Sequence, residues 1–217
     1  MTFDMDYALS ILPMLLQATI ITFQASILGF GFALVGGLAL AVMRLSGIRP
    51  MVAFATAYIE FIRSTPLLTQ LFFLFYILPL YGLTLDAFAT GILGLGLHYS
   101  SYTAEVYRGG IQGVPRGQWE AAAALNLSTV RTWRLVVLPQ AIPPVIPALG
   151  NYLVSMFKDT PLLATITVLE LFGVAIAEAG NSFRYLEPMA IVGLIFLALS
   201  VPSALLVRGL EKRFALR

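Results

Sequence analysis

Residues 116–139, RGQWEAAAALNLSTVRTWRLVVLP, form a basic and polar island between long apolar segments of the chain. Residues 118–125 are rich in alanine and other good helix formers. Asn126 follows where a helix often ends in a left-handed residue, and asparagine suits that position after glycine. Ser128 can cap a second short helix, which Pro139 should end. Two short helices at an angle predict a knob that fits a groove on a partner, or else an ordinary helical hairpin without a partner.

The composition is that of an integral membrane protein. The chain is 59% hydrophobic and 11% charged, whereas soluble domains are about 25% charged. The absence of cysteine excludes disulfides, thiolate nucleophiles and cysteine metal sites, and the single histidine, His98, argues against a metal centre. No G-x-x-x-x-G-K-[ST] loop is present, so we expect no P-loop nucleotide site. We therefore predict no catalytic residue, no metal site and no cofactor in this chain, and no nucleic-acid partner.

Apolar runs predict an all-α protein with about five transmembrane helices in one domain, residues 1–217. The expected spans cover residues 19–43, 65–81, 85–107, a stretch from 140 that Pro161 kinks, and 188–207. An interfacial helix is expected at 50–63, and Ser64-Thr65-Pro66 should cap the span that follows it. Residues 162–187 remain unassigned beyond an apolar piece and a polar segment. Gly29, Gly31, Gly36 and Gly37, like Gly91, Gly94 and Gly96, indicate close helix packing.

Basic residues predict the orientation of these spans. Lys and Arg are enriched on the cytoplasmic side of membrane proteins. In a five-span arrangement Arg44, Arg108 and the basic carboxyl terminus fall on one side, together with residues 116–139. The acidic amino terminus, which does not look like a cleaved signal peptide, falls on the other side. We expect the amino terminus outside and the carboxyl terminus in the cytoplasm.

Ionisable and polar side chains within the spans are candidates for a solute path, because they are costly in lipid and usually face a bundle interior. Spacings of three and four residues place one stripe on the third span and another on the fourth. The first stripe is His98, Ser101, Tyr102, Glu105 and Arg108, and the second is Asn151, Ser155 and Lys158, with Asp159 beside it. The alternative is that Glu105 pairs with Arg108, that Lys158 pairs with a carboxylate, and that His98 is a packed, hydrogen-bonded side chain.

The island at 116–139 resembles the EAA loop of ABC importer permeases, whose pattern is E-A-A, three residues, Gly, nine residues, then I-x-L-P. Here Asn126 replaces the glycine and Val136 the isoleucine. The resemblance implies a type I ABC importer transmembrane domain, with a core at about 15–207 and a cytoplasmic coupling loop at 116–139. The residues it assigns to ATPase coupling are Gly117, Glu120, Ala121, Ala122, Asn126, Leu138 and Pro139.

Three further segments narrow the resemblance. FIRSTPLLTQLF at 61–72, YTAEVYRGGI at 102–111 and KDTPL at 158–162 are similar to motifs of polar amino acid importer permeases, the histidine/glutamine group. The overall sequence, notably at residues 94–101 and 185–188, is most similar to the ectoine/hydroxyectoine permease subunits of that group.

This resemblance implies a multi-pass permease of the bacterial inner membrane that imports a small zwitterionic solute, with ectoine or hydroxyectoine expected. The alternative solute is a polar amino acid of the glutamine, histidine or arginine type. The implied partners are ABC ATPase subunits that carry ATP and Mg, a second permease subunit, an extracytoplasmic solute-binding protein and the lipid bilayer. Readings from other classes are a proton-coupled secondary transporter that uses Glu105 or Asp159, and a membrane enzyme with His98 as base.

Overall fold

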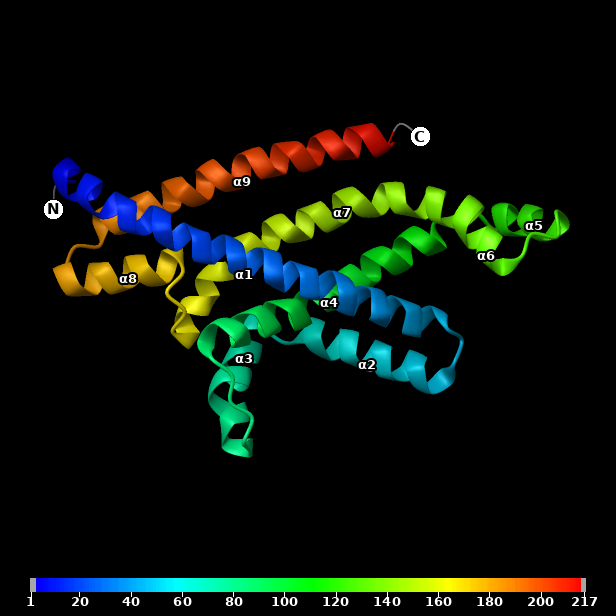
Figure 1. Cartoon of the computed structure of the whole chain (residues 1–217), viewed down its shortest axis with the longest axis horizontal. Helices are drawn as coiled ribbons and strands as arrows, with labels where there is room; N and C mark the ends of the chain where they lie inside the picture. Colours follow the sequence, from blue (N-terminus) through cyan, green and yellow to red (C-terminus); the bar gives the residue numbers. More distant parts are fainter. Residues whose placement is uncertain (1–2, 216–217) are drawn as a thin grey trace.

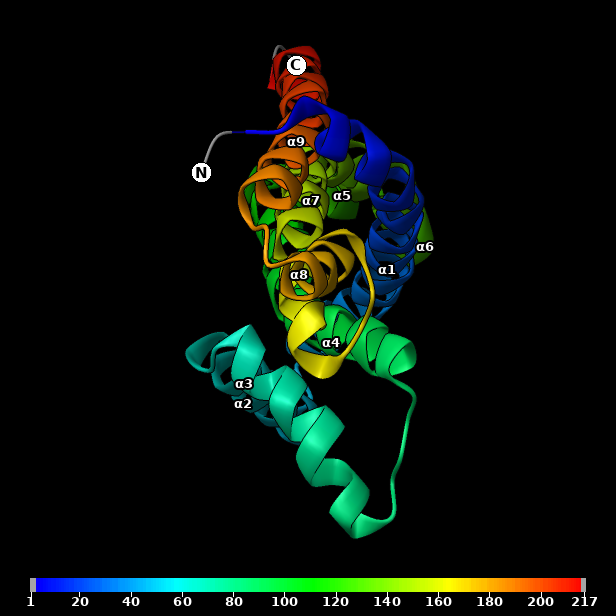
Figure 2. The same ribbon diagram turned by 90° about the vertical axis from the view of Figure 1, so that its left-hand side faces the viewer.

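The computed structural model describes residues 3–215, and every regular element in that range is a helix (Figures 1 and 2). The elements, with η for π- and 3-10 segments, are α1 Met5–Leu45, α2 Arg49–Ser64, α3 Leu67–Phe72, η1 Phe73–Ile77, η2 Leu78–Tyr81, α4 Ala87–Gln112, α5 Arg116–Ala124, α6 Thr129–Thr132, η3 Trp133–Val137, α7 Leu138–Asp159, η4 Thr160–Ile166, α8 Leu171–Ser182 and α9 Leu186–Ala215. Long helices α1, α4, α7 and α9 lie side by side, and α3 with η1 and η2 projects away from them as an arm (Figure 2).

Two helices in residues 3–215, α1 and α9, are each long and apolar enough to cross a membrane. Two bent pairs are apolar enough to form one further span each or a re-entrant loop: α2 with the arm, at 106°, and the run from α6 to η4 with α8, at 46°. The expected third span is helix α4, whose 26 residues reach about 39 Å. It is less apolar than the others because it carries His98, Glu105 and Arg108, which are all buried or half-buried by the protein.

Helix α1 is longer than the sequence predicted, since it begins at Met5 rather than at residue 19. The Asp4 carboxylate caps it by accepting a hydrogen bond from the Tyr7 N–H at 3.1 Å. Pro13 lies inside the helix without ending it. The helix of the first expected span therefore also includes residues 5–18, which precede the span expected at 19–43.

Glycines allow α1 and α4 to pack closely, as predicted. A Cβ on Gly37 would overlap the Thr103 hydroxyl and lie 2.9 Å from both the Ala104 nitrogen and the Ser100 oxygen. The Thr103 hydroxyl donates to the Ala33 carbonyl of α1 at 2.7 Å, which ties the two helices together. Gly31 is the exception, because a Cβ there would meet no atom within 4 Å.

The elbow between α2 and α3 corrects the cap predicted at residues 64–66. Pro66 itself precedes α3, and no side chain caps that helix. The Thr65 hydroxyl instead donates backward to the carbonyls of Phe61 and Ile62, at 3.1 and 3.3 Å. Thr65 therefore satisfies the last turn of α2, because the extended backbone at Thr65 and Pro66 turns the chain away from that helix.

We predict that Gly37→Ala destabilises the chain by about 1–3 kcal/mol, because an added methyl overpacks the contact with Thr103. Gly31→Ala is the matched control and should leave stability unchanged or slightly raised. The measurement is the fraction of monodisperse protein after heating in detergent. Equal thermal resistance of the two variants would contradict the assigned packing.

Candidate functional site

The predicted knob is present, and it projects beyond the ends of α4 and α7 (Figure 1). Helix α5 ends in two hydrogen bonds, from the Asn126 N–H to the Ala123 oxygen at 2.9 Å and from the Leu127 N–H to the Ala122 oxygen at 3.1 Å. Asn126 has φ of +50°, as predicted. These features form a Schellman motif, which satisfies the free carbonyls at the end of α5 and redirects the chain toward α6.

Two tryptophans fix α5 against the segment that returns to the membrane. The rings of Trp119 and Trp133 meet edge to face, with centroids 5.4 Å apart. Buried Val114, Val137 and Ala141 lie beneath them. The knob is therefore packed on a small apolar core, and we expect it to move as a rigid body.

Exposure divides the predicted coupling residues. Gly117, Glu120, Ala121, Asn126, Leu138 and Pro139 are exposed, but Ala122 is 2% exposed. Ala122 packs toward the core of the knob while Ala121 lies on its surface, because successive residues of a helix point about 100° apart. The coupling role of both residues stays a prediction. Large apolar side chains that the sequence analysis did not select, Leu125, Val130 and Leu135, are 63–74% exposed on the same knob.

Two other local expectations for the knob differ from the structure. Ser128 precedes α6 but makes no side-chain cap bond. Pro139 does not end the second helix, because the chain widens into the π-helical segment η3 and continues as α7. The Gln140 side chain donates to the Val136 carbonyl at 2.7 Å, close to where Pro139 lacks an N–H. The knob is thus joined to α7 without a break.

His98 and Ser101, the first two residues of the predicted α4 stripe, form hydrogen bonds within the protein. The imidazole Nδ1 of His98 lies 3.1 Å from the side-chain oxygen of Gln70, and His98 is 9% exposed. Ser101 is fully buried and donates to the His98 carbonyl at 2.7 Å. His98 is therefore a packed, hydrogen-bonded side chain, as the alternative interpretation predicted.

The middle of the bundle contains an aromatic cluster that the sequence analysis found only in part. Tyr99, Tyr102 and Tyr152 lie with ring centroids 5.4–6.2 Å apart. The Tyr99 hydroxyl donates to the Asp159 carboxylate at 2.7 Å. The Arg63 guanidinium lies 5.3 Å from the centre of the Tyr102 ring. The i+3 spacing of Tyr99 and Tyr102 was the available signal for this group.

Glu105 is engaged in ion pairs. Its carboxylate contacts Arg44 at the end of α1 and Arg108 on its own helix, the latter at 2.6 Å. The Glu105–Arg108 pair was predicted from the i,i+3 spacing, whereas the contact with Arg44 joins residues 61 positions apart. Glu105 is therefore not a free acceptor for a cationic solute.

The predicted stripe on α7 does not face α4 as a whole. The Asn151 amide donates to Glu211 of α9 at 2.9 Å. Ser155 is half-buried, and Lys158 is exposed and forms no ion pair with the described part of the chain. The α7 residues that do reach the aromatic cluster are Tyr152 and Asp159.

Opposite the knob, charged groups close the other end of the bundle. The Arg184 guanidinium contacts Asp4 at 3.1 Å and Glu187 at 3.0 Å, and lies 4.3 Å from the centre of the Tyr7 ring. The Tyr7 N–H and the Arg184 guanidinium hold the pKa of the Asp4 carboxyl below its usual value. The start of α1 is thereby fastened to the turn between α8 and α9.

Glu170 is a fully buried carboxylate that the sequence analysis did not select. It caps α8 by accepting from the Gly173 N–H at 2.7 Å and from the Thr22 hydroxyl at 3.3 Å. The Leu171 N–H in turn donates to the Thr22 hydroxyl at 3.1 Å. Glu170 therefore joins the start of α8 to α1.

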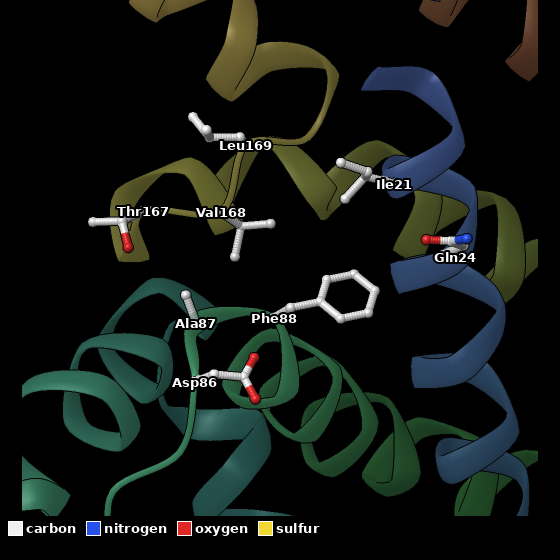
Figure 3. Close-up of a pocket in the computed structure, with 8 residues that line it drawn as sticks. All are labelled: Ile21, Gln24, Asp86, Ala87, Phe88, Thr167, Val168 and Leu169. Atoms are coloured by element: carbon white, nitrogen blue, oxygen red, sulfur yellow. The ribbon is translucent and has the colours of Figure 1, made fainter. Parts of the chain in front are cut away.

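A pocket of about 500 Å³ lies between α1, the start of α4 and the segment before α8 (Figure 3). Its lining is Ile21, Gln24, Asp86, Ala87, Phe88, Thr167, Val168 and Leu169. The Asp86 carboxylate already caps α4 through the Ala89 N–H at 2.9 Å. None of the predicted site residues lines this pocket.

Residues 33–216 match the protein family described as "Binding-protein-dependent transport system inner membrane component". A probable amino-acid ABC transporter permease protein of Sinorhizobium fredii is 52% identical over 94% of this chain and 89% of its own length. The probable amino-acid ABC transporter permease protein PatM of Vibrio harveyi is 38% identical over 90% of this chain and 89% of its own length.

The fold is that of a type I ABC importer permease. It matches a chain in the crystal structure of an amino acid ABC transporter with histidines, with a TM-score of 0.92 and 34% identity. The match covers 98% of this chain and 100% of that one.

We predict that Asn126→Gly preserves the knob and that Asn126→Val disrupts it. Glycine accepts the positive φ, whereas a β-branched residue held there costs about 1–3 kcal/mol. The measurement is resistance of the knob to limited proteolysis at equal membrane content of the two variants. Equal cleavage of both would show that the left-handed backbone at Asn126 is not required.

Proposed function

This chain belongs to the binding-protein-dependent transport system inner membrane component family, and we propose that it is the permease of an ATP-driven importer of a polar amino acid. The observation that carries this proposal is the knob, an exposed and internally packed pair of helices outside the apolar spans. An exposed apolar surface of this kind is typical of a docking site. ATP and Mg would bind to the partner ATPase.

The proposed coupling contact is the exposed face of the knob. Glu120 and Ala121 lie on this face, and Leu125 and Val130 supply apolar area that suits a groove. The packed tryptophan pair would keep the knob intact when the ATPase moves it. Closure of the ATPase pair would then move the knob, and both α4 and α7 would follow, because they lead into it and out of it.

We place the solute path at the aromatic cluster. The tyrosine hydroxyls and the Asp159 carboxylate offer acceptors, and Arg63 offers positive charge. Lys158, the exposed residue that precedes Asp159, would offer a second positive charge to a solute that approaches the cluster. A zwitterionic solute carries both a carboxylate and a cation, so this combination suits it. Ectoine and amino acids share that chemistry, but the relatives described above are named for amino acids, which favours the amino acid.

The rest of the importer follows from the same proposal. The chain would lie in the bacterial inner membrane with its amino terminus outside and its carboxyl terminus in the cytoplasm. It would pair with a second permease subunit and receive its solute from an extracytoplasmic binding protein. The end closed by Arg184 would then face the binding protein, because it is opposite the knob.

A proton-coupled transporter is the second candidate, with Glu105 or Asp159 as the relay. Glu105 is held in ion pairs with Arg44 and Arg108, so a proton relay there would have to break these contacts at each cycle. This candidate also gives no role to the knob.

We predict that Ala121→Arg blocks binding of the ATPase while the chain still inserts into the membrane. A long charged side chain at an exposed coupling position would prevent close docking. Ala121→Ser keeps a small side chain and is the matched control. The measurement is the amount of ATPase that co-purifies with each variant. Full co-purification with Ala121→Arg would refute this contact surface.

We predict that Lys158→Met lowers solute uptake about tenfold or more, because a hydrogen bond to a charged group contributes about 1.5–3 kcal/mol. The assembled complex should persist, since Lys158 has no ion pair within the described residues whose loss would leave a carboxylate unpaired. Lys158→Arg, which keeps the charge, should retain more uptake. Uptake and assembled complex are measured in the same membranes, and a matched fall in both would rule out solute contact.

A further inference from the structure

We propose that His98 and Gln70 are a pair of positioning residues that sets the angle of the elbow between α2 and α3, so that the arm moves together with α4. This proposal rests on the proposed transport function. Neither residue is a solute ligand in it. Their role is to keep the arm, α3 with η1 and η2, in a fixed relation to the helix that leads into the coupling knob.

Gln70 closes the elbow from the inside. Its side-chain nitrogen lies 2.9 Å from the Ile62 carbonyl, 3.1 Å from the Thr65 carbonyl and 2.8 Å from the Thr65 hydroxyl. The two carbonyls belong to the last turn of α2 and the residue after it, where a helix leaves carbonyls unsatisfied. A residue of α3 thus holds the end of α2, and the bend of 106° is stabilised by one amide.

The three acceptors around the Gln70 side-chain nitrogen determine whether His98 donates or accepts in its hydrogen bond with Gln70. Because the Gln70 nitrogen faces acceptors, the Gln70 oxygen faces the imidazole. His98 therefore donates from Nδ1–H to that oxygen at 3.1 Å. A histidine that donates from Nδ1 fixes the amide of Gln70 in the one orientation that also closes the elbow.

Helix α4 packs against both helices of the elbow near the pair. A Cβ on Gly94, one turn before His98, would lie 2.5 Å from Leu71 Cδ2, so α3 touches the backbone face of α4. On the other side the His98 ring lies against Tyr102, with centroids 5.2 Å apart, and Arg63 at the end of α2 lies over that same tyrosine. Helix α4 therefore contacts both helices that form the elbow, α3 through Leu71 and α2 through Arg63.

The arm is anchored at its base and exposed at its tip. Leu67 and Leu71 are buried in the core, and the Tyr76 hydroxyl donates to the Thr165 carbonyl at 3.0 Å. The arm extends away from the bundle (Figure 2), and its tip residues Leu80 and Tyr81 are 79% and 77% exposed. The middle of α4 carries the His98 contact, and the carboxyl end of α4 leads through residues 113–115 into α5. A displacement of the knob would accordingly reach the arm through α4 and the His98–Gln70 bond.

The test compares His98→Asn with His98→Leu in the assembled importer. The Asn Nδ2, like the His Nδ1, is attached to Cγ and can donate to Gln70, whereas leucine has the same shape as asparagine and no donor. We expect uptake per assembled complex to fall about tenfold with leucine, which leaves the Gln70 oxygen without its partner. Asparagine should retain most of the uptake. Equal uptake by the two variants, at equal assembly, would overturn the proposal.

A distance measurement separates this proposal from the proposed function. The chain has no cysteine, so spin labels can be placed at Ala53→Cys on α2 and Tyr81→Cys at the tip of the arm, both exposed. We expect a narrow distance distribution with His98 or asparagine and a broad one with leucine. An unchanged distribution with leucine would refute the positioning role even if transport fell.

Gln70→Glu tests the other half of the pair. A carboxylate keeps an acceptor for His98 but loses the donors that hold Ile62 and Thr65, so the elbow should loosen as it does with His98→Leu. A narrow distribution in this variant would also contradict the proposal. If the permease fails to bind an ATPase at all, the proposed function fails, while the elbow distances still report on the pair.

Discussion

Helix α4 can lie against α1 only because α1 has a glycine where the two backbones meet. Apolar side chains gain little by leaving lipid for another apolar surface, so membrane helices rely on close backbone approach and on hydrogen bonds between helices. Gly37 opens that approach, and the bond from Thr103 to the Ala33 carbonyl secures it. The polar stripe of α4 finds its partners on other helices, which an ionisable helix needs in lipid. These partners are Gln70 at His98, Tyr152 at Tyr102 and Arg44 at Glu105.

Three features of the proposed mechanism lie on helix α4. His98 holds the elbow, Tyr99 and Tyr102 form part of the aromatic cluster, and Glu105 is tied to the end of α1 through Arg44. The same helix then runs into the knob, which returns through η3 to α7 and Asp159. Movement of the knob would therefore displace α4 and α7, the two helices that contribute to the proposed path. It would also reach the elbow through His98.

Local patterns were sufficient to predict the features that depend on neighbouring residues. The left-handed Asn126, the packing at Gly37 and the Glu105–Arg108 pair all follow from propensity or helical spacing. The pairs Arg44–Glu105, Gln70–His98 and Thr22–Glu170 join residues far apart in the chain, and they depend on where helices cross and bend. The burial of Ala122 depends on how α5 seats on its own small core, which sequence spacing does not specify.

The most direct measurement is solute uptake into vesicles that contain the permease with its ATPase, with binding protein and solute outside. If force enters through the knob, uptake requires ATP and persists when an uncoupler removes the proton gradient at constant ATP. Uptake that collapses with the uncoupler while ATP is held constant would contradict the central claim. It would also return Glu105 and Asp159 to consideration as proton carriers.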